Sequence, residues 1–323
     1  MPSLFLIETI QRGSSISFPF LGGLSLNPPS YFTVFGRNIY FYGVIIALGF
    51  ILAILYCSKR APEFGLKSDD FYDMMIWLIP CSILGARLYY VLFRADYYLA
   101  NPREILAVWE GGLVIYGGII TGCLVCWLVC RKKKIPVLAM LDVCSFGVLI
   151  GQALGRWGNF FNREAFGAET DVFCRMGLTA PDGSTIYVHP TFLYESLWNL
   201  VGLIFLIWFR KHRKRRYNGQ FILTYFFWYG LGRAWIEGLR ADSLYIGSTG
   251  IRVSQLLSVV LVLVAGTFLY LNRKNTSLLT EAEDAGPEPK VMSEPNPEAT
   301  PEPEAETVEA EDSKSEEQQN SED

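Results

Sequence analysis

Residues 155–167, with the sequence Gly-Arg-Trp-Gly-Asn-Phe-Phe-Asn-Arg-Glu-Ala-Phe-Gly, bring polar and ionisable side chains to the end of a long apolar stretch. An unpaired ionisable side chain at membrane depth costs about 3 kcal/mol. Arg156, Asn159 and Asn162 are spaced by three residues, so on a helix their side chains share one edge. Arginine suits phosphate because its planar guanidinium donates two parallel charge-assisted hydrogen bonds. The segment therefore predicts a site for a polar or anionic substrate.

A second polar face lies further along the chain. Tyr229, Arg233, Glu237 and Arg240 lie at positions i, i+4, i+8 and i+11, which is one face of a helix. Arg233 and Glu237 can pair, which reduces the cost of burying each of them. A structural ion pair between helices is the alternative interpretation. Arg240 leaves a positive surplus on this face, and that surplus favours an anionic ligand.

Two shorter segments add candidate groups. The run His-Pro-Thr-Phe-Leu-Tyr-Glu at 189–195 opens an apolar stretch, and His189 is the one imidazole on that side of the predicted membrane, so it is a candidate base. Two glycine pairs within 109–118 flank the start of another stretch, which indicates unwound backbone that lines a cavity. Tyr116 would then point its phenol into that cavity, or it anchors the helix at the membrane surface.

Seven apolar blocks must position these groups. Each is long enough to cross a hydrocarbon core, which needs roughly 20 helical residues. The sequence therefore predicts an all-α, polytopic membrane protein with about seven transmembrane helices. Glycines at 147, 151 and 155 form a small-residue ridge in the fourth block, which favours close helix packing. The predicted spans are 39–57, 71–93, 112–130, 137–160, 191–209, 219–239 and 252–271.

The distribution of lysine and arginine predicts the orientation. One set of connecting loops holds fifteen of these residues and the other set holds eight. Cytoplasmic loops carry the excess of positive charge. We expect the N-terminus outside and the C-terminus in the cytoplasm, so the polar groups gather toward the outer leaflet. Arg87 and Tyr42 belong to the same outer level.

Charge also divides the chain into regions. Residues 281–323 hold 16 acidic and 2 basic side chains, a net charge of −14, whereas the remaining 280 residues carry 26 basic and 16 acidic ones, a net of +10. A Pro-rich, acidic segment with few apolar residues cannot offset its ordering entropy. We expect an outside segment at 1–38, a transmembrane catalytic domain at 39–272 and a disordered acidic cytoplasmic tail at 273–323.

These motifs resemble those of the prolipoprotein diacylglyceryl transferase family. The stretch 155–167 is similar to the family signature, 189–195 to its His-Pro-x-x-Leu-Tyr-Glu motif, and 229–237 to its Tyr-Gly-x-x-Arg-x-x-x-Glu motif. The resemblance covers roughly residues 38–272 and leaves the acidic tail outside. Two positions depart from it, since the family often has histidine at the place of Tyr116 and glutamine at that of Phe192.

The resemblance implies transfer of a diacylglyceryl group from phosphatidylglycerol to the lipobox cysteine of a bacterial prolipoprotein, in the cytoplasmic membrane and with the site toward the outer leaflet. Arg156 and Arg233 would stabilise the phosphate that leaves. The proton of the thiol would pass to Tyr116, to His189 or to neither. The implied substrate-binding residues are Arg156, Asn159, Asn162, Glu164, Gly167, Tyr42, Glu195, Tyr229 and Glu237.

A transporter or flippase for an anionic lipid or metabolite is the alternative, because it too places arginines in membrane spans. No internal repeat of the kind that transporters show is present in the sequence. We expect no cofactor, no metal site and no nucleic-acid partner. The expected partners are phosphatidylglycerol, a prolipoprotein signal peptide with its lipobox cysteine, and membrane lipid.

Overall fold

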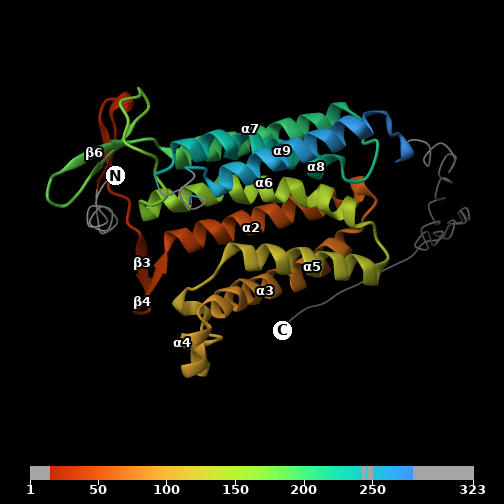
Figure 1. The fold of residues 1–323 in the computed structure, drawn as a ribbon, viewed down its shortest axis with the longest axis horizontal. Coiled ribbons are helices and arrows are strands. Elements are labelled where there is room, and N and C mark those ends of the chain that lie inside the picture. Colours follow the sequence, from red (N-terminus) through yellow and green to blue (C-terminus); the bar gives the residue numbers. More distant parts are fainter. Residues whose placement is uncertain (1–14, 242–244, 246–249, 279–323) are drawn as a thin grey trace, which may run out of the picture.

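The structure is a computed structural model that describes residues 15–241, 245 and 250–278. Most of its length is a bundle of long helices that lie side by side (Figure 1). The acidic residues 281–323, for which we predicted a disordered tail, lie outside the described residues. The α-helices are α2 (Phe41–Arg60), α3 (Ser68–Phe93), α4 (Ala95–Ala100), α5 (Ile115–Lys133), α6 (Val137–Asn162), α7 (Thr191–His212), α8 (Gln220–Ile236) and α9 (Val253–Leu271).

Six helices of the described chain are long and apolar enough to cross a membrane, which makes the protein a multi-pass membrane protein. Helix α8 has 17 residues, fewer than the roughly 20 that a hydrocarbon core needs. The predicted span at 219–239, and with it the total of seven, therefore stays a prediction. The six candidate spans are Phe41–Phe64, Ser68–Phe93, Ile115–Lys133, Val137–Asn162, Thr191–His212 and Val253–Lys274.

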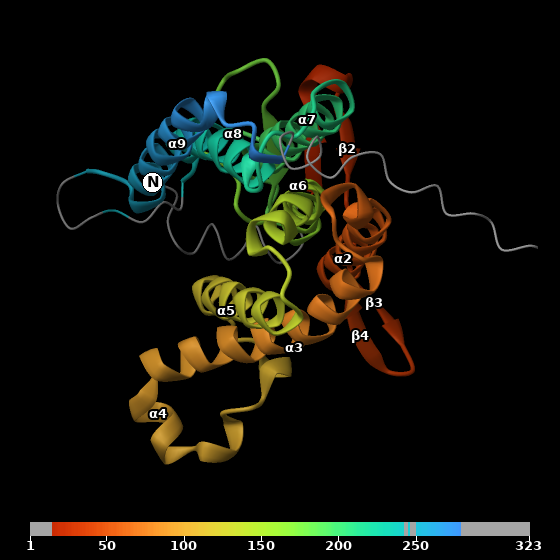
Figure 2. The ribbon, with the colours of Figure 1, turned by 90° about the vertical axis from the view of Figure 1, so that its right-hand side faces the viewer.

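Small residues let the helices pack closely in pairs. Helices α3 and α5 form one pair, which stands apart from α6, α7, α8 and α9 when the bundle is seen along its length (Figure 2). A Cβ atom added at Gly117 would lie 2.4 Å from the carbonyl oxygen of Gly85, so this pair requires glycine. In the predicted ridge, Gly147 and Gly155 contact side chains of α2, and Gly151 lies against Gly49 of α2, although a Cβ added at Gly151 would meet no atom within 4 Å.

Six short strands within the described residues were not expected from the sequence, so the all-α prediction is incomplete. Four of them form a sheet in the order β2-β1-β5-β6, and the other two form a hairpin. The sheet covers one end of the bundle, beside the end of α6 and the start of α7 (Figure 1). Its core includes Ile16, Phe18, Phe160 and Phe192. The strands are β1 (Ser15–Phe18), β2 (Leu24–Leu26), β3 (Tyr31–Val34), β4 (Arg37–Tyr40), β5 (Met176–Thr179) and β6 (Thr185–Val188).

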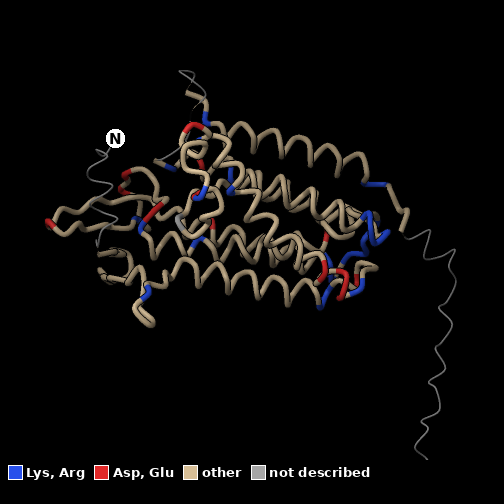
Figure 3. Tube along the Cα trace, turned by 90° about the horizontal axis from the view of Figure 1, so that it is seen from below, with Lys and Arg blue, Asp and Glu red and all other residues tan. Residues whose placement is uncertain are grey.

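Charged residues gather at the two ends of the bundle and leave its middle apolar (Figure 3). At the end opposite the sheet, the buried carboxylate of Asp142 on α6 caps the N-terminus of helix α8. It accepts backbone hydrogen bonds from Gly219 at 2.8 Å and from Phe221 and Ile222 at 2.9 Å each. The first amides of a helix have no partner within it, so a buried carboxylate there satisfies them. Asp142 therefore fixes where α8 starts.

We predict that Asp142→Ala lowers the free energy of unfolding by about 2 kcal/mol or more, because three buried amides lose a charged acceptor. Thermal unfolding in detergent, followed by circular dichroism, measures the effect as a lower transition temperature. Asp69→Ala is the matched control, because Asp69 is exposed. Equal transition temperatures for the two variants would contradict this role of Asp142.

Candidate active site

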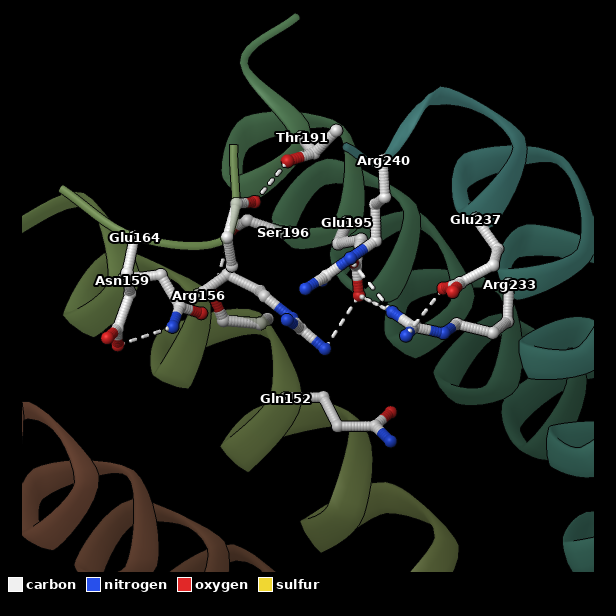
Figure 4. A network of polar contacts seen from close by, with 12 residues as sticks. Gln152, Arg156, Asn159, Glu164, Thr191, Glu195, Ser196, Arg233, Glu237 and Arg240 are labelled. Atoms are coloured by element: carbon white, nitrogen blue, oxygen red, sulfur yellow. Dashed lines mark hydrogen bonds and ion pairs between the residues drawn. The ribbon is translucent and has the colours of Figure 1, made fainter. Parts of the chain in front are cut away.

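One buried carboxylate, that of Glu195 on α7, joins three arginines from separate segments (Figure 4). Its oxygens lie 2.7 Å from Arg156 Nη2, 3.1 Å from Arg233 Nη1 and 3.5 Å from Arg240 Nη1. The Glu195 side chain is only 6% exposed. Ion pairs at such a depth are much less screened than those at a surface. Arg156 and Arg233, which we expected to share a site, thus share Glu195 as an ion-pair partner.

The cluster is cationic overall. Glu237 Oε2 forms a second ion pair with Arg233 Nη2 at 2.6 Å, which confirms the pairing predicted from their spacing. Among the described residues, three arginines against two glutamates leave a net charge of +1. Arg252 also donates a hydrogen bond to the backbone carbonyl of Glu237, which raises the surplus to +2. An anion is the ligand that such a surplus favours.

The fold brings these residues together because three helices have an end at the same level. Arg156 lies on the last turns of α6, Glu195 near the start of α7 and Arg233 on the last turn of α8. Arg240 follows α8 and forms an isolated β-bridge with Gly167. The polar groups therefore meet at one end of the bundle, away from its apolar middle.

Gly167 has a packing reason to be glycine. Its backbone amide donates to the carbonyl of His189 at 2.9 Å. A Cβ atom on Gly167 would lie 2.5 Å from His189 Cβ and 2.8 Å from the Leu239 carbonyl oxygen. The residue therefore lets the segments before α7 and after α8 meet. This contact positions Arg240, so Gly167 acts on the site through the backbone.

A small polar cluster lies beside Arg156. Asn159 Nδ2 donates to Glu164 Oε1 at 2.9 Å, and Asn162 Nδ2 donates to the same oxygen at 3.3 Å. The shared edge that their spacing predicted is thus confirmed. The two amides hold the Glu164 carboxylate at the end of α6, where Asn159 also borders a cavity.

An apolar cavity of about 550 Å³ runs beside α6 and ends at the arginine cluster. Its lining extends along α6 from Cys144 to Arg156 and Asn159. The fifteen steps along the helix from residue 144 to residue 159 span about 22 Å at 1.5 Å per step. Most of its wall is apolar side chain or glycine from α2, α3 and α6. The arrangement fits a ligand with a long hydrocarbon part and an anionic group at one end.

Tyr42 stands at the polar end of this cavity. Its ring packs over Gly158, where an added Cβ would lie 2.6 Å from Tyr42 Cδ2. Tyr229 lies one helical turn before Arg233 and stacks on Tyr225 with 5.8 Å between ring centroids. The Tyr225 hydroxyl in turn accepts from Gln152 Nε2 at 3.0 Å. These contacts extend the polar network toward the middle of α6.

The two candidate bases differ in their surroundings. His189 Nδ1 lies 3.4 Å from the Tyr194 hydroxyl, and burial lowers the pKa of His189 below its usual value. The Tyr194 hydroxyl also contacts Cys174 Sγ at 3.1 Å. Tyr116 is 49% exposed and lines neither the apolar cavity nor the pocket beside Arg87. Within the described residues no hydrogen bond joins its phenol to the arginines.

Two further arginines are structural clamps. Arg87, which we predicted to lie within a span, is buried and donates to the carbonyls of Glu104, Ile105 and Gly111 at 2.6, 2.9 and 2.8 Å. Gly111 and its neighbour have positive φ angles, so the backbone there is unwound, as the first glycine pair predicted.

Arg163 had no assigned role in the sequence. It ends α6 and donates to Asn27 Oδ1 at 2.8 Å and to the Pro28 carbonyl at 2.7 Å. The N-terminal segment is thereby attached to the end of the helix that carries Arg156. Arg163 lies beside the polar cluster but is only 4% exposed. This burial distinguishes it from a substrate-binding residue.

Comparison with known proteins gives consistent matches. A family model described as prolipoprotein diacylglyceryl transferase matches residues 29–271. The phosphatidylglycerol–prolipoprotein diacylglyceryl transferase of Finegoldia magna is 43% identical over 243 residues, 75% of this chain and 94% of that protein. The Streptococcus pneumoniae protein of the same name is 46% identical over 251 residues, 76% of this chain and 95% of the relative. That of Enterococcus faecalis is 44% identical over 254 residues, 76% and 91% of the two chains.

We predict that Glu195→Gln destabilises the protein by about 3 kcal/mol, because three guanidinium groups lose their shared buried counter-ion. A lower transition temperature in detergent measures this. Inorganic phosphate should raise that temperature more in the variant than in the unchanged protein, since an anion can take the place of the carboxylate.

Glu169→Gln is the control, because Glu169 is exposed in a nearby loop. If Glu195→Gln unfolds at the same temperature as this control and does not respond to phosphate, Glu195 does not hold the arginines together.

Proposed function

Since the chain belongs to the prolipoprotein diacylglyceryl transferase family, we propose that it transfers the diacylglyceryl group of phosphatidylglycerol to the lipobox cysteine of a bacterial lipoprotein precursor. The products are a thioether-linked diacylglyceryl protein and glycerol phosphate. The single observation that carries the proposal, beyond family membership, is a buried cluster of three arginines, one of which, Arg156, lines the end of a long apolar cavity. A transporter or flippase is not favoured by these relatives.

The lipid donor fits the site in two parts. Its acyl chains lie in the apolar cavity along α6, where about 22 Å of helix accommodates a long hydrocarbon chain. Its phosphate binds at the arginines. Arg156 meets the ligand first, because its side chain is 25% exposed, against 17% for Arg233 and 12% for Arg240. Arg156 also lines the cavity itself.

The chemistry requires charge to be stabilised on the leaving phosphate. The cysteine sulfur attacks the glycerol carbon, a C–S bond forms, and the C–O bond to phosphate breaks with its electron pair going to oxygen. Guanidinium groups already held in place stabilise that charge without reorganising. Glu195 is a positioning residue in this scheme, because it fixes the guanidinium groups that face the phosphate.

The attacking species is a thiolate, so the thiol proton must leave. His189 is the better candidate base, because its pKa is lowered by burial and it is therefore neutral near pH 7. The His189 carbonyl accepts a hydrogen bond from the Gly167 amide, and Gly167 forms a β-bridge with Arg240. The backbones of His189 and Arg240 therefore lie on either side of Gly167. Tyr116, exposed at the start of α5, orients the precursor peptide. Asn159, Asn162 and Glu164 bind the glycerol hydroxyls of the headgroup.

We further propose that the chain crosses the bacterial cytoplasmic membrane seven times with the site toward the outer leaflet. With the 3-10 turn Glu237–Leu239, helix α8 extends over 220–239, 20 residues or about 30 Å. The basic loops then face the cytoplasm. A membrane-impermeant maleimide on intact cells should label Asp182→Cys and not Lys214→Cys, both in a Cys174→Ser background. Labelling of both or of Lys214→Cys alone would refute this orientation.

We predict that Arg156→Lys reduces transfer at least about 100-fold, because the charge remains but the two-pronged hydrogen bonding to phosphate is lost. Arg156→Ala should lose still more. The measurement is thioether formation from labelled phosphatidylglycerol and a lipobox peptide, with purified protein of unchanged transition temperature. Arg103→Lys is the control, because Arg103 is exposed at the same end of the bundle. Full activity in folded Arg156→Ala would refute the proposed function.

The pH dependence of the transfer activity tests whether His189 is the base. A base must be neutral to accept a proton, and burial lowers the pKa of His189, so it stays neutral to a lower pH than a free imidazole of pKa about 6.5. Activity should therefore persist at pH 6.5 and fall only as the pH drops below that. His189→Gln should be slow at every pH and lose this acidic limb, whereas His212→Gln at the other end of the bundle should keep it. An unchanged limb in His189→Gln would assign the titration to another group.

A further inference from the structure

A second cavity, of about 640 Å³, lies at the opposite end of the bundle from Glu195. It is formed by the ends of α7 and α9 and by the loop before α8. Its lining includes Arg213, Lys214, Arg216 and Arg273 and has no acidic residue among the described ones. We call it the basic pocket. Four positive charges at one concave surface attract an anionic partner.

The acidic groups of this end do not neutralise the pocket in the described part of the chain. Glu63 pairs with Arg60 and Arg210, and Asp142 binds the first amides of α8. The side chains of Arg213 and Lys214 are exposed and form no ion pair within residues 15–241 and 250–278.

Two hydrogen bonds connect the segments around the basic pocket. Arg216 Nη1 donates to the Arg273 carbonyl at 2.7 Å, which joins the loop before α8 to the end of α9. The Leu278 amide then donates to the Arg216 carbonyl at 3.1 Å. The described chain therefore ends directly at the basic pocket.

The residues after Leu278 carry the opposite charge. Glu281 is three residues beyond Leu278, which is at most about 11 Å of extended chain. Glu283 and Asp284 come next, and residues 281–323 together carry a net charge of −14. The family model ends at residue 271, so the diacylglyceryl transfer that we propose does not account for this segment.

We propose that the acidic cluster Glu281, Glu283 and Asp284 docks in the basic pocket, as a ligand supplied by the chain itself. The tether of a few residues gives the cluster a high effective concentration at the pocket, and closing so short a loop costs little entropy. Each exposed ion pair is weak, so binding needs several pairs together and weakens with salt. The contact ties the start of the tail to the loop before α8.

Zero-length cross-linking of the full-length protein tests the proposal. A carbodiimide joins a lysine amine to a carboxylate only where the two are in contact, and Lys214 is the lysine of the pocket. In neutral phosphatidylcholine vesicles, peptide mass spectrometry should find Lys214 joined to Glu281, Glu283 or Asp284. The yield should fall about tenfold at about 1 M salt, where the Debye length is about 3 Å.

Matched variants of equal charge separate position from charge. The triple change Glu281→Gln, Glu283→Gln and Asp284→Asn should lower the total yield of links from Lys214 to the tail about tenfold. The triple change Glu309→Gln, Glu311→Gln and Asp312→Asn also removes three negative charges and should leave that yield unchanged. Arg213→Gln with Arg216→Gln should reduce it, because two of the cations are gone.

Three results would overturn the proposal. Lys214 joined to no tail carboxylate would show an empty pocket, and equal links to early and late tail residues would show unspecific attraction. The third is loss of the link in vesicles that contain phosphatidylserine, which would show that an anionic lipid headgroup takes the pocket in a membrane. All three leave diacylglyceryl transfer unaffected, so they are distinguishable from failure of the proposed function.

Discussion

The shared ion pair between Glu195 and three arginines is the constraint on which the site depends. A buried carboxylate with one guanidinium partner links only two segments, whereas Glu195 on α7 joins the ends of α6 and α8 and the segment after α8. Removal of Glu195 would leave three guanidinium groups without their shared counter-ion at low dielectric. The positions of these segments are therefore coupled to each other, and Arg156, the most exposed of the three arginines, borders the apolar cavity.

Buried carboxylates have different partners at the two ends of the bundle. At the end with the sheet, arginines pair with buried glutamates, and the described residues of the cluster keep a net positive charge. At the other end, Asp142 is fully buried and binds backbone amides, and the basic loops are exposed. The apolar middle separates the two charged ends (Figure 3).

The sequence predicts the contacts that depend on local spacing. Arg233 and Glu237, four residues apart, were expected to pair, and they do. The partner of Arg156 was beyond such reasoning, because Glu195 is 39 residues away (195 − 156) and the pairing depends on how α6 and α7 pack. The clamps at Arg87 and Arg163 were missed for the same reason, since their acceptors are carbonyls and side chains of distant loops.

The strands were missed because each has only three or four residues, too few to show a period in the sequence. Their pairing has a consequence for biogenesis. Strand β1 lies between β2 and β5, and Ile16 is opposite Leu178, 162 positions later (178 − 16). A ribosome adds about 5–20 residues per second, so the nascent β1 waits roughly 8–30 s for its neighbour to be synthesised. Assembly of the four-stranded sheet is thus a late, long-range event, and the N-terminal strand must avoid premature pairing with other chains until then.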